Sequence, residues 1–131
     1  MIAVDTNVLL RYILNDDEAQ FALASSFFKA RTVQNPAFVG LIVLCEMAWS
    51  LRRRYGFSRE QVRSVVMRLF ETAEVQIEAE AEISPLVSGA DMKADIADLL
   101  ISHCAGRSGC AATVTLDRRA AARIPGMELL A

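Results

Sequence analysis

Histidine and paired cysteines are scarce in this sequence. It contains one histidine, His103, and three cysteines that show no CxxC spacing. A zinc site that needs two imidazoles is therefore excluded, and a Ser-His-Asp triad could only use His103 as its base. Because His103 continues an apolar helical pattern, we expect a structural histidine in the core or at its edge. We expect buried, free thiols in a reducing compartment at Cys45, Cys104 and Cys110.

Long hydrophobic runs are missing as well. The longest, residues 38–45, includes a glycine and is far shorter than the roughly 20 apolar residues that cross a bilayer. Asp5 interrupts the first apolar residues and no basic segment precedes them, so we expect no signal peptide and no membrane association. With 131 residues, 53% of them hydrophobic, and no repeats or linkers, the sequence predicts one soluble, cytoplasmic domain, residues 1–131.

Lysine is rare, since only Lys29 and Lys93 accompany 12 arginines. Arginine suits bidentate contact with phosphate, although a GC-rich genome produces the same bias. The net charge of −2 argues against nucleic-acid binding by bulk attraction. If a metal cluster neutralised four carboxylates, however, 14 cationic residues would face 12 acidic ones. The overall charge therefore leaves the partner open.

Strand-like and helical segments alternate along the chain. Strands are predicted over residues 2–4, 37–39, 75–78 and 111–116, with a last edge strand over 127–130. Helices are predicted over residues 7–14, 18–31, 41–54, 58–70, 79–87 and 120–123, and another begins after Asp91 as its N-cap. This alternation predicts an α/β fold with a mainly parallel sheet and helices on both faces.

Two of the predicted strands end at a carboxylate. The first runs into Asp5-Thr6-Asn7, and the strand over 111–116 runs into Asp117. Ligands of parallel α/β sheets bind at the carboxyl ends of the strands. Asp5 and Asp117 would share one sheet edge if their strands are neighbours. The alternative for Asp5, Thr6 and Asn7 is that they only cap the next helix.

The predicted helix over 41–54 is apolar nearly all round, which is typical of a buried element. Glu46 is the single acid in it. A buried, unpaired carboxylate is costly, so it takes up a proton or finds a cation. Glu46 is therefore a candidate metal ligand, and the alternative is that it pairs with an arginine or with backbone amides.

Two further acids lie on the helix that follows Asp91. Asp95 and Asp98 are three residues apart and share one face with Ser102. Like charges at this spacing destabilise an ordinary helix, and a bound divalent cation would reverse the effect. The alternative is that both acids only complement the helix dipole, which fits Asp95 better than Asp98.

The helices over 41–54 and 58–70 form a predicted helical hairpin. Ser58 and Gln61 have the spacing of a capping box at the second helix. Arginines stud the outer surface of this hairpin. They either form a solvated face or contact phosphate or a partner.

Taken together, the candidate ligands are carboxylates without histidine or cysteine. Such a set suits hard cations, Mg²⁺ or Mn²⁺. Sites of this kind support the in-line attack of water on a phosphodiester bond, because the metal lowers the pKa of the water and neutralises charge on the phosphate.

At this point the chain resembles the PIN-domain family, with the VapC toxins of bacterial toxin–antitoxin pairs as the nearest match. The motifs lie over residues 4–7 (VDTN), 44–49 (LCEMAW), 94–101 (ADIADLLI) and 115–118 (TLDR). The resemblance covers the whole chain. It implies a three-layer α/β/α sandwich and a Mg²⁺-dependent endoribonuclease, a hydrolase of tRNA, rRNA or mRNA. It also implies a homodimer that a VapB-type antitoxin inhibits.

The resemblance also assigns residues. Asp95 matches an extra acid of one subgroup, and Leu99-Leu100 stands where many members have Ala-Leu. Asp5 and Asp98 would be the principal metal ligands, and the other acids would complete the metal shell. The acidic quartet would be Asp5, Glu46, Asp98 and Asp117, with Thr6, Asn7 and Thr115 in supporting positions. Arg118 or Arg11 could contact phosphate.

Two other functions compete with this one. Phosphotransfer through an aspartyl-phosphate at Asp5 is disfavoured, because haloacid-dehalogenase-like proteins need a second aspartate where this chain has Asn7. The other is a non-catalytic or partner-regulated PIN-like binding module, whose acidic pocket only docks an arginine of an antitoxin.

Overall fold

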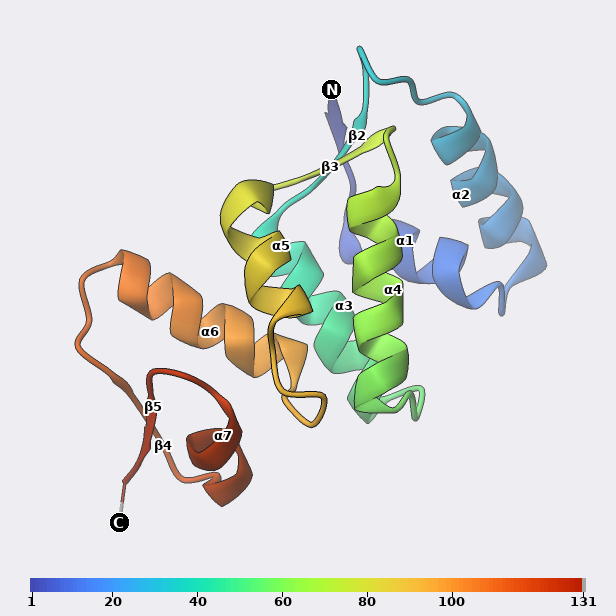
Figure 1. Ribbon diagram of the computed structural model, residues 1–131. Helices are drawn as coiled ribbons and strands as arrows, with labels where there is room; N and C mark the ends of the chain where they lie inside the picture. Colours follow the sequence, from blue (N-terminus) through green and yellow to red (C-terminus); the bar gives the residue numbers. More distant parts are fainter. Residues whose placement is uncertain (131) are drawn as a thin grey trace.

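The computed structural model describes residues 1–130, and helices and parallel strands alternate along them (Figure 1). The α/β class and the parallel strand arrangement predicted from the sequence are confirmed. In chain order the elements are β1 (Ile2–Ala3), α1 (Thr6–Leu14), α2 (Glu18–Lys29), β2 (Ala37–Val39), α3 (Leu41–Arg53), α4 (Arg59–Glu71), β3 (Val75–Ile77), α5 (Glu80–Ser88), α6 (Ile96–Arg107), β4 (Thr113–Thr115), α7 (Arg118–Arg123) and β5 (Met127–Leu129).

The first three strands form a parallel sheet in the order β1-β2-β3. Ile2 lies opposite Ala37, which in turn lies opposite Val75. The central strand β2 is almost fully buried, and in β3 the side chains alternate between core and solvent. β-Branched and small residues at these positions allow the sheet to pack closely against the helices.

The hairpin of α3 and α4 forms as predicted. Gly56 lies in the turn with φ 69°, a conformation that favours glycine. The capping box is present, because Ser58 Oγ accepts a bond from Gln61 N at 3.1 Å and Gln61 Oε1 accepts one from Ser58 N at 2.8 Å. The stripe of Val62, Val66 and Leu69 is buried.

The last two strands form a separate parallel sheet, β4-β5. We refer to β4, α7 and β5 together as the C-terminal unit. Figure 1 shows this unit, coloured red, beyond α6 and away from the three-stranded sheet. The strands before Asp5 and Asp117 are therefore not neighbours in this structure, and the condition for the two acids to share one sheet edge is not met.

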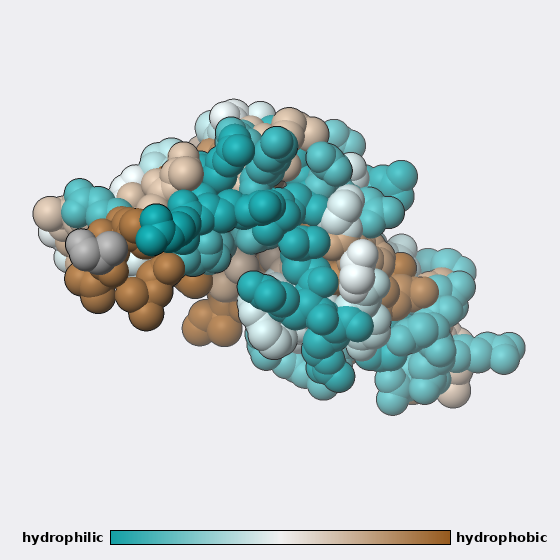
Figure 2. Space-filling model, turned by 90° about the horizontal axis from the view of Figure 1, so that it is seen from below, coloured by the Kyte–Doolittle hydropathy of each residue, from teal (hydrophilic) through white to brown (hydrophobic). Residues whose placement is uncertain are grey.

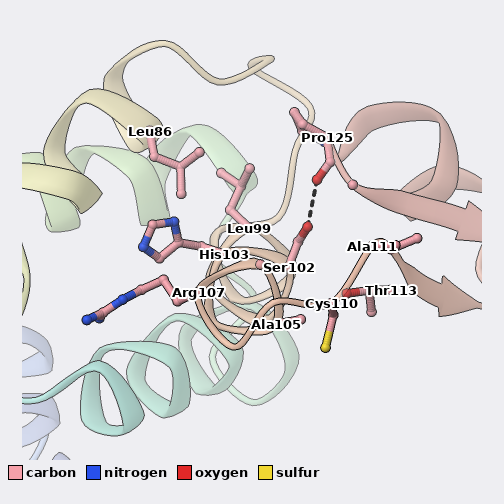
Figure 3. Close-up of a pocket in the computed structure, with 13 residues that line it drawn as sticks. Leu86, Leu99, Ser102, His103, Ala105, Arg107, Cys110, Ala111, Thr113 and Pro125 are labelled. Atoms are coloured by element: carbon pink, nitrogen blue, oxygen red, sulfur yellow. Dashed lines mark hydrogen bonds between the residues drawn. The ribbon is translucent and has the colours of Figure 1, made fainter.

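Polar contacts hold the C-terminal unit in this position. Ser102 Oγ on α6 donates a hydrogen bond to the carbonyl oxygen of Pro125 at 2.6 Å (Figure 3). Arg123 on α7 forms an ion pair with Asp91 at 3.0 Å. The side chain of Ile124 is buried and adds apolar contact with the core. These contacts, rather than pairing with β1, fix the unit.

Helix α3 is not buried all round, contrary to the prediction from its apolar sequence. Leu44 and Leu51 face the core with no exposed surface. Ile42 is 82% exposed and Trp49 is 53% exposed. Glu46 lies on the exposed side too, so the prediction that its carboxylate is buried is wrong. The opposite face of α3 borders an open cavity instead of a second packed layer.

Helix α6 begins at Ile96, with Asp95 in the N-cap position. The prediction of Asp91 as its N-cap is wrong. Asp91 Oδ1 instead accepts a hydrogen bond from Lys93 N at 2.7 Å, a local turn that competes with helix formation. This backbone hydrogen bond from Lys93, followed by the hydrogen bond and charge of Arg123, lowers the pKa of the Asp91 carboxyl.

The histidine and the cysteines are partly as predicted. His103 Nε2 lies 3.2 Å from Glu82 Oε2 at the edge of α6, which confirms a structural histidine. The three cysteines are free. Cys45 is half-buried, but Cys104 and Cys110 are exposed, so the prediction of burial is wrong for these two. No helix within residues 1–130 is both long and apolar enough to cross a membrane.

Candidate functional site

Helices α3 and α6 border an open cavity of about 600 Å³ that carries four of the five predicted acids. Glu46 comes from α3, Asp95 and Asp98 from the start of α6, and Asp117 from the C-terminal unit. Trp49, Arg52 and Arg53 also line the cavity. Residues far apart in the sequence thus present carboxylates to one space, which we call the acidic cavity.

Asp98 lies in the first turn of α6 and is half-buried. Burial raises the pKa of the Asp98 carboxyl, and the negative charges of Asp95 and Asp117 raise it further. Arg53 and Arg59 act in the opposite direction. The acids of the cavity are therefore close enough to repel one another, a condition that a bound cation would relieve.

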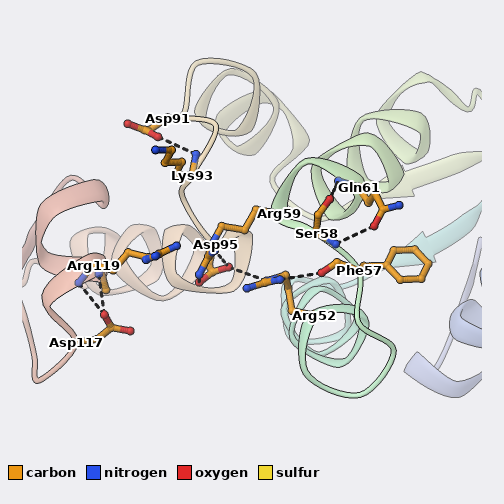
Figure 4. Close-up of polar contacts among 11 residues, drawn as sticks. Arg52, Phe57, Ser58, Arg59, Gln61, Asp91, Lys93, Asp95, Asp117 and Arg119 are labelled. Atoms are coloured by element: carbon orange, nitrogen blue, oxygen red, sulfur yellow. Dashed lines mark hydrogen bonds and ion pairs between the residues drawn. The ribbon is translucent and has the colours of Figure 1, made fainter.

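Asp95 is engaged by two arginines (Figure 4). Arg52 Nε donates a hydrogen bond to Asp95 Oδ1 at 3.2 Å. Arg59 Nη2 donates one to Oδ2 at 3.3 Å, and Arg59 Nε lies 2.9 Å from Oδ1, within ion-pair distance. Arg52 Nη1 also donates to the carbonyl oxygen of Phe57 at 2.9 Å, which holds the guanidinium in place. The negative charge of Asp95 is therefore compensated by two arginines, and these ion pairs connect α3 and α4 to the start of α6.

Glu46 also has a contact with the first residue of α1. The buried Thr6 donates a hydrogen bond from Oγ1 to Glu46 Oε1 at 2.7 Å. Because Thr6 directly follows Asp5 and begins α1, this bond ties the start of α1 to the rim of the acidic cavity. The supporting position predicted for Thr6 thus has a direct contact with one of the candidate acids.

Asp5 occupies the N-cap position of α1 but makes no side-chain capping bond. The simple capping interpretation of Asp5 therefore has no support in the contacts. Its exposed carboxylate lines a different cavity, of about 590 Å³, together with Asn7 and Arg11. The guanidinium of Arg11 forms an ion pair with Asp16 at 2.6 Å and not with Asp5. The structure therefore does not bring Asp5 into the acidic cavity.

Asp117 is the N-cap of α7. Its Oδ1 accepts hydrogen bonds from Arg119 N at 2.8 Å and from Ala120 N at 3.1 Å (Figure 4). Thr115 Oγ1 accepts a bond from Asp117 N at 3.1 Å, so Thr115 contacts the backbone of the acid that it precedes. The second carboxylate oxygen of Asp117 takes part in neither capping bond.

The side chains of the five predicted acids are of a type that suits a hard divalent cation, but they do not lie close enough together to bind one in this structure. All of them are carboxylates, the ligand class that Mg²⁺ and Mn²⁺ prefer. Within residues 1–130, however, no group of three or more acidic, histidine or cysteine side chains is arranged to hold a metal ion. Asp5 lines a different cavity from the other four acids.

Sequence reasoning missed the arginines that neutralise Asp95. It identified an arginine-rich hairpin but not the partner of Arg52 and Arg59. The available signal was their position at the two ends of the turn between α3 and α4, which points both side chains toward the same neighbour. Trp49 was noted in a motif, but its exposure beside the cavity was not foreseen.

This fold and site define a class of protein: an α/β domain with parallel strands, in which strand ends and helix starts supply a set of carboxylates. The chain belongs to the PIN domain family, whose model matches residues 2–126. PIN domains are generally metal-dependent nucleases. A search for similar curated proteins gives no match.

Proposed function

We propose that this PIN domain is a Mg²⁺-dependent endoribonuclease that hydrolyses RNA phosphodiester bonds. The observation that carries the proposal is the acidic cavity, in which four carboxylates from three parts of the chain adjoin two arginines. The raised pKa of Asp98 supports it, because mutual repulsion among acids is the usual consequence of a site built for a cation.

The carboxylates have different roles in this proposal. Asp98 is a principal metal ligand, and Glu46 and Asp117 of the same cavity complete the shell. Asp5, the other principal ligand, lines a separate cavity in this structure and would have to be brought beside them. Asp95, neutralised by Arg52 and Arg59, is a positioning residue that holds the start of α6. When bound, Mg²⁺ or Mn²⁺ would lower the pKa of the attacking water and neutralise the scissile phosphate.

The surroundings of the cavity suit RNA. Arg53 is exposed and lines the cavity beside the acids, where it can contact a phosphate. Trp49, with half of its side chain exposed, offers a face on which an unpaired base can stack. The phosphate contact earlier assigned to Arg11 is disfavoured by its ion pair with Asp16. Arg118, next to Asp117, keeps this role.

In its biological setting, we place the domain as the VapC-type toxin of a type II toxin–antitoxin pair in the cytoplasm, a single domain over residues 1–131. Its partner would be a VapB-type antitoxin, which inhibits it by inserting an arginine into the acidic cavity. A guanidinium can pair with Glu46 or Asp98 and take the place of the cation. The protein would act as a homodimer.

Sequencing the 5′ ends of cellular RNA after induction of the protein tests this function. Wild type is expected to produce new 5′ ends at defined positions and to slow growth unless the antitoxin is present. Asp98→Asn should produce none, whereas Glu71→Gln, a substitution of an exposed acid at the end of α4 far from the cavity, should behave as wild type. Identical 5′ ends with wild type and Asp98→Asn would refute the proposal.

The second candidate is a PIN-like module that binds a partner without catalysis. The incomplete convergence of the metal ligands favours it. Such a module would bind its antitoxin and leave cellular RNA uncut with or without that partner. The same sequencing experiment therefore separates the two functions.

A further inference from the structure

The three-stranded sheet ends in an open edge at β1. Strand β1 pairs with β2, and in the part of the chain that the structure describes no strand pairs with its other side. Ile2 in this strand is 46% exposed. An open edge presents unpaired backbone N–H and C=O groups and readily accepts another strand.

Strand β4 is open in the same way. It pairs with β5 on one side, and no strand among residues 1–130 pairs with its other side. Val114 is 59% exposed and Leu116 is 79% exposed. Figure 2 shows hydrophobic surface, coloured brown, at the left of the view, the side on which Figure 1 shows the C-terminal unit. Two strands alone are marginally stable, and a further strand beside β4 would stabilise them.

The two open edges match each other. If β4 lay parallel to β1, the strands would form one parallel sheet in the order β3-β2-β1-β4-β5. Strand β1 ends two residues before Asp5, and β4 ends two residues before Asp117. The carboxyl ends of parallel strands lie at the same edge of a sheet. This pairing would therefore place Asp117 beside Asp5 and supply the convergence that the separate sheets lack.

The contacts of the C-terminal unit indicate where the second strand comes from. To reach β1 of its own chain, the unit would have to leave α6 and break the bond between Ser102 and Pro125. It would also lose the ion pair between Arg123 and Asp91. A second copy can bring its β4 to β1 with all of these contacts intact, because they leave the outer edge of β4 free.

We propose that two copies of the chain pair reciprocally, with β4 of each copy added in parallel to β1 of the other. Asp117 of one copy then joins Asp5 of the other in a shared site. A two-fold axis repeats this contact, so both open edges of both copies are satisfied. The strand pairing rests on the open edges alone, whereas a catalytic role of the shared site rests on the proposed function.

Cross-linking tests the pairing without reference to activity. Alignment of Asp5 with Asp117 places Ile2 opposite Val114. In a background with Cys104→Ser and Cys110→Ser, a chain with Ile2→Cys is mixed with a size-tagged chain that carries Val114→Cys. A short bismaleimide reagent should join the two chains. The matched control, Glu71→Cys at the exposed end of α4 in place of Val114→Cys, should give little product.

A chain that carries both Ile2→Cys and Val114→Cys decides between one copy and two. Products of two chains are expected. Cross-linking within a single chain would show that β4 closes onto its own β1 and would overturn the proposal, as would no cross-linking at all. Sedimentation provides a second measurement: wild type and Glu71→Lys, a charge change at the exposed end of α4, should sediment as dimers and Val114→Lys as a monomer. A dimeric Val114→Lys would also contradict the pairing.

Complementation tests the shared site. Asp5→Asn and Asp117→Asn proteins should each be inactive on RNA. After mixing and re-equilibration, about half of the dimers are mixed and each has one intact site, so about a quarter of wild-type activity should return. No recovery would show that both acids act within one chain. If cross-linking succeeds but wild type cuts no RNA, the proposed function fails and the pairing stands; if wild type cuts RNA without cross-linking, only the pairing fails.

Discussion

The hydrogen bond from Thr6 to Glu46 gives the most quantitative prediction from the structure. It is a direct polar link between the start of α1 and the acidic cavity, with 2.7 Å between Oγ1 and Oε1. Thr6→Val removes the hydroxyl and keeps the branched shape. A hydrogen bond to a charged group contributes about 1.5–3 kcal/mol. Since Glu46 is exposed and can be rehydrated, we expect a loss below this range, about 1 kcal/mol in the free energy of unfolding.

For a domain of this size, that loss lowers Tm by about 3–5 °C. Thr6→Ser keeps the hydroxyl and should retain most of the stability. Urea unfolding followed by circular dichroism measures both variants, and RNA cleavage should fall for Thr6→Val because Glu46 loses its fixed orientation. Equal stability of Thr6→Val and wild type, or equal losses for the valine and serine variants, would refute the role of this bond.

Three further predictions follow from the charges of the cavity. The pKa of Asp98 is raised in the folded protein, so its contribution to stability is present below the ordinary carboxyl pKa and is lost as pH rises through the raised value. Asp98→Asn should therefore increase Tm at pH 7 more than at pH 4, in thermal scans without metal. Asp95→Asn weakens partly exposed ion pairs to Arg52 and Arg59, so urea unfolding should show a loss of about 1 kcal/mol that shrinks at high salt. Added Mn²⁺ should raise the Tm of wild type but not of Asp98→Asn, in a titration followed by differential scanning fluorimetry; equal shifts in both would place the cation elsewhere.

Local sequence signals predicted most of the elements. The stripe of α4 and its capping box at Ser58 depend on residues within a few positions of one another, and both are present. The strands before Asp5 and Asp117 were also found, since short apolar runs that end at a carboxylate are clear boundaries. Thr6 contacts Glu46 and Thr115 contacts the backbone of Asp117, and their supporting roles in catalysis stay predictions.

Signals that depend on distant parts of the chain were not available from the sequence. Whether β4 pairs with β1 depends on how the C-terminal unit packs against α6, through contacts such as that of Ser102 with Pro125. The exposure of one face of α3 could not be predicted from the sequence for a similar reason. Apolar residues such as Ile42 are expected in the core unless the neighbouring layer is known to be absent. The start of α6 was misplaced because the local turn at Asp91 resembles a cap.

The most direct measurement is cleavage of a labelled RNA by the purified protein, with Mg²⁺ or with EDTA. Wild type and Glu71→Gln should cut the RNA at the same internal positions with Mg²⁺ and not with EDTA, and Asp98→Asn should fail in both conditions. Cleavage by Asp98→Asn at the wild-type rate, or by wild type in EDTA, would contradict a metal-dependent site in the acidic cavity.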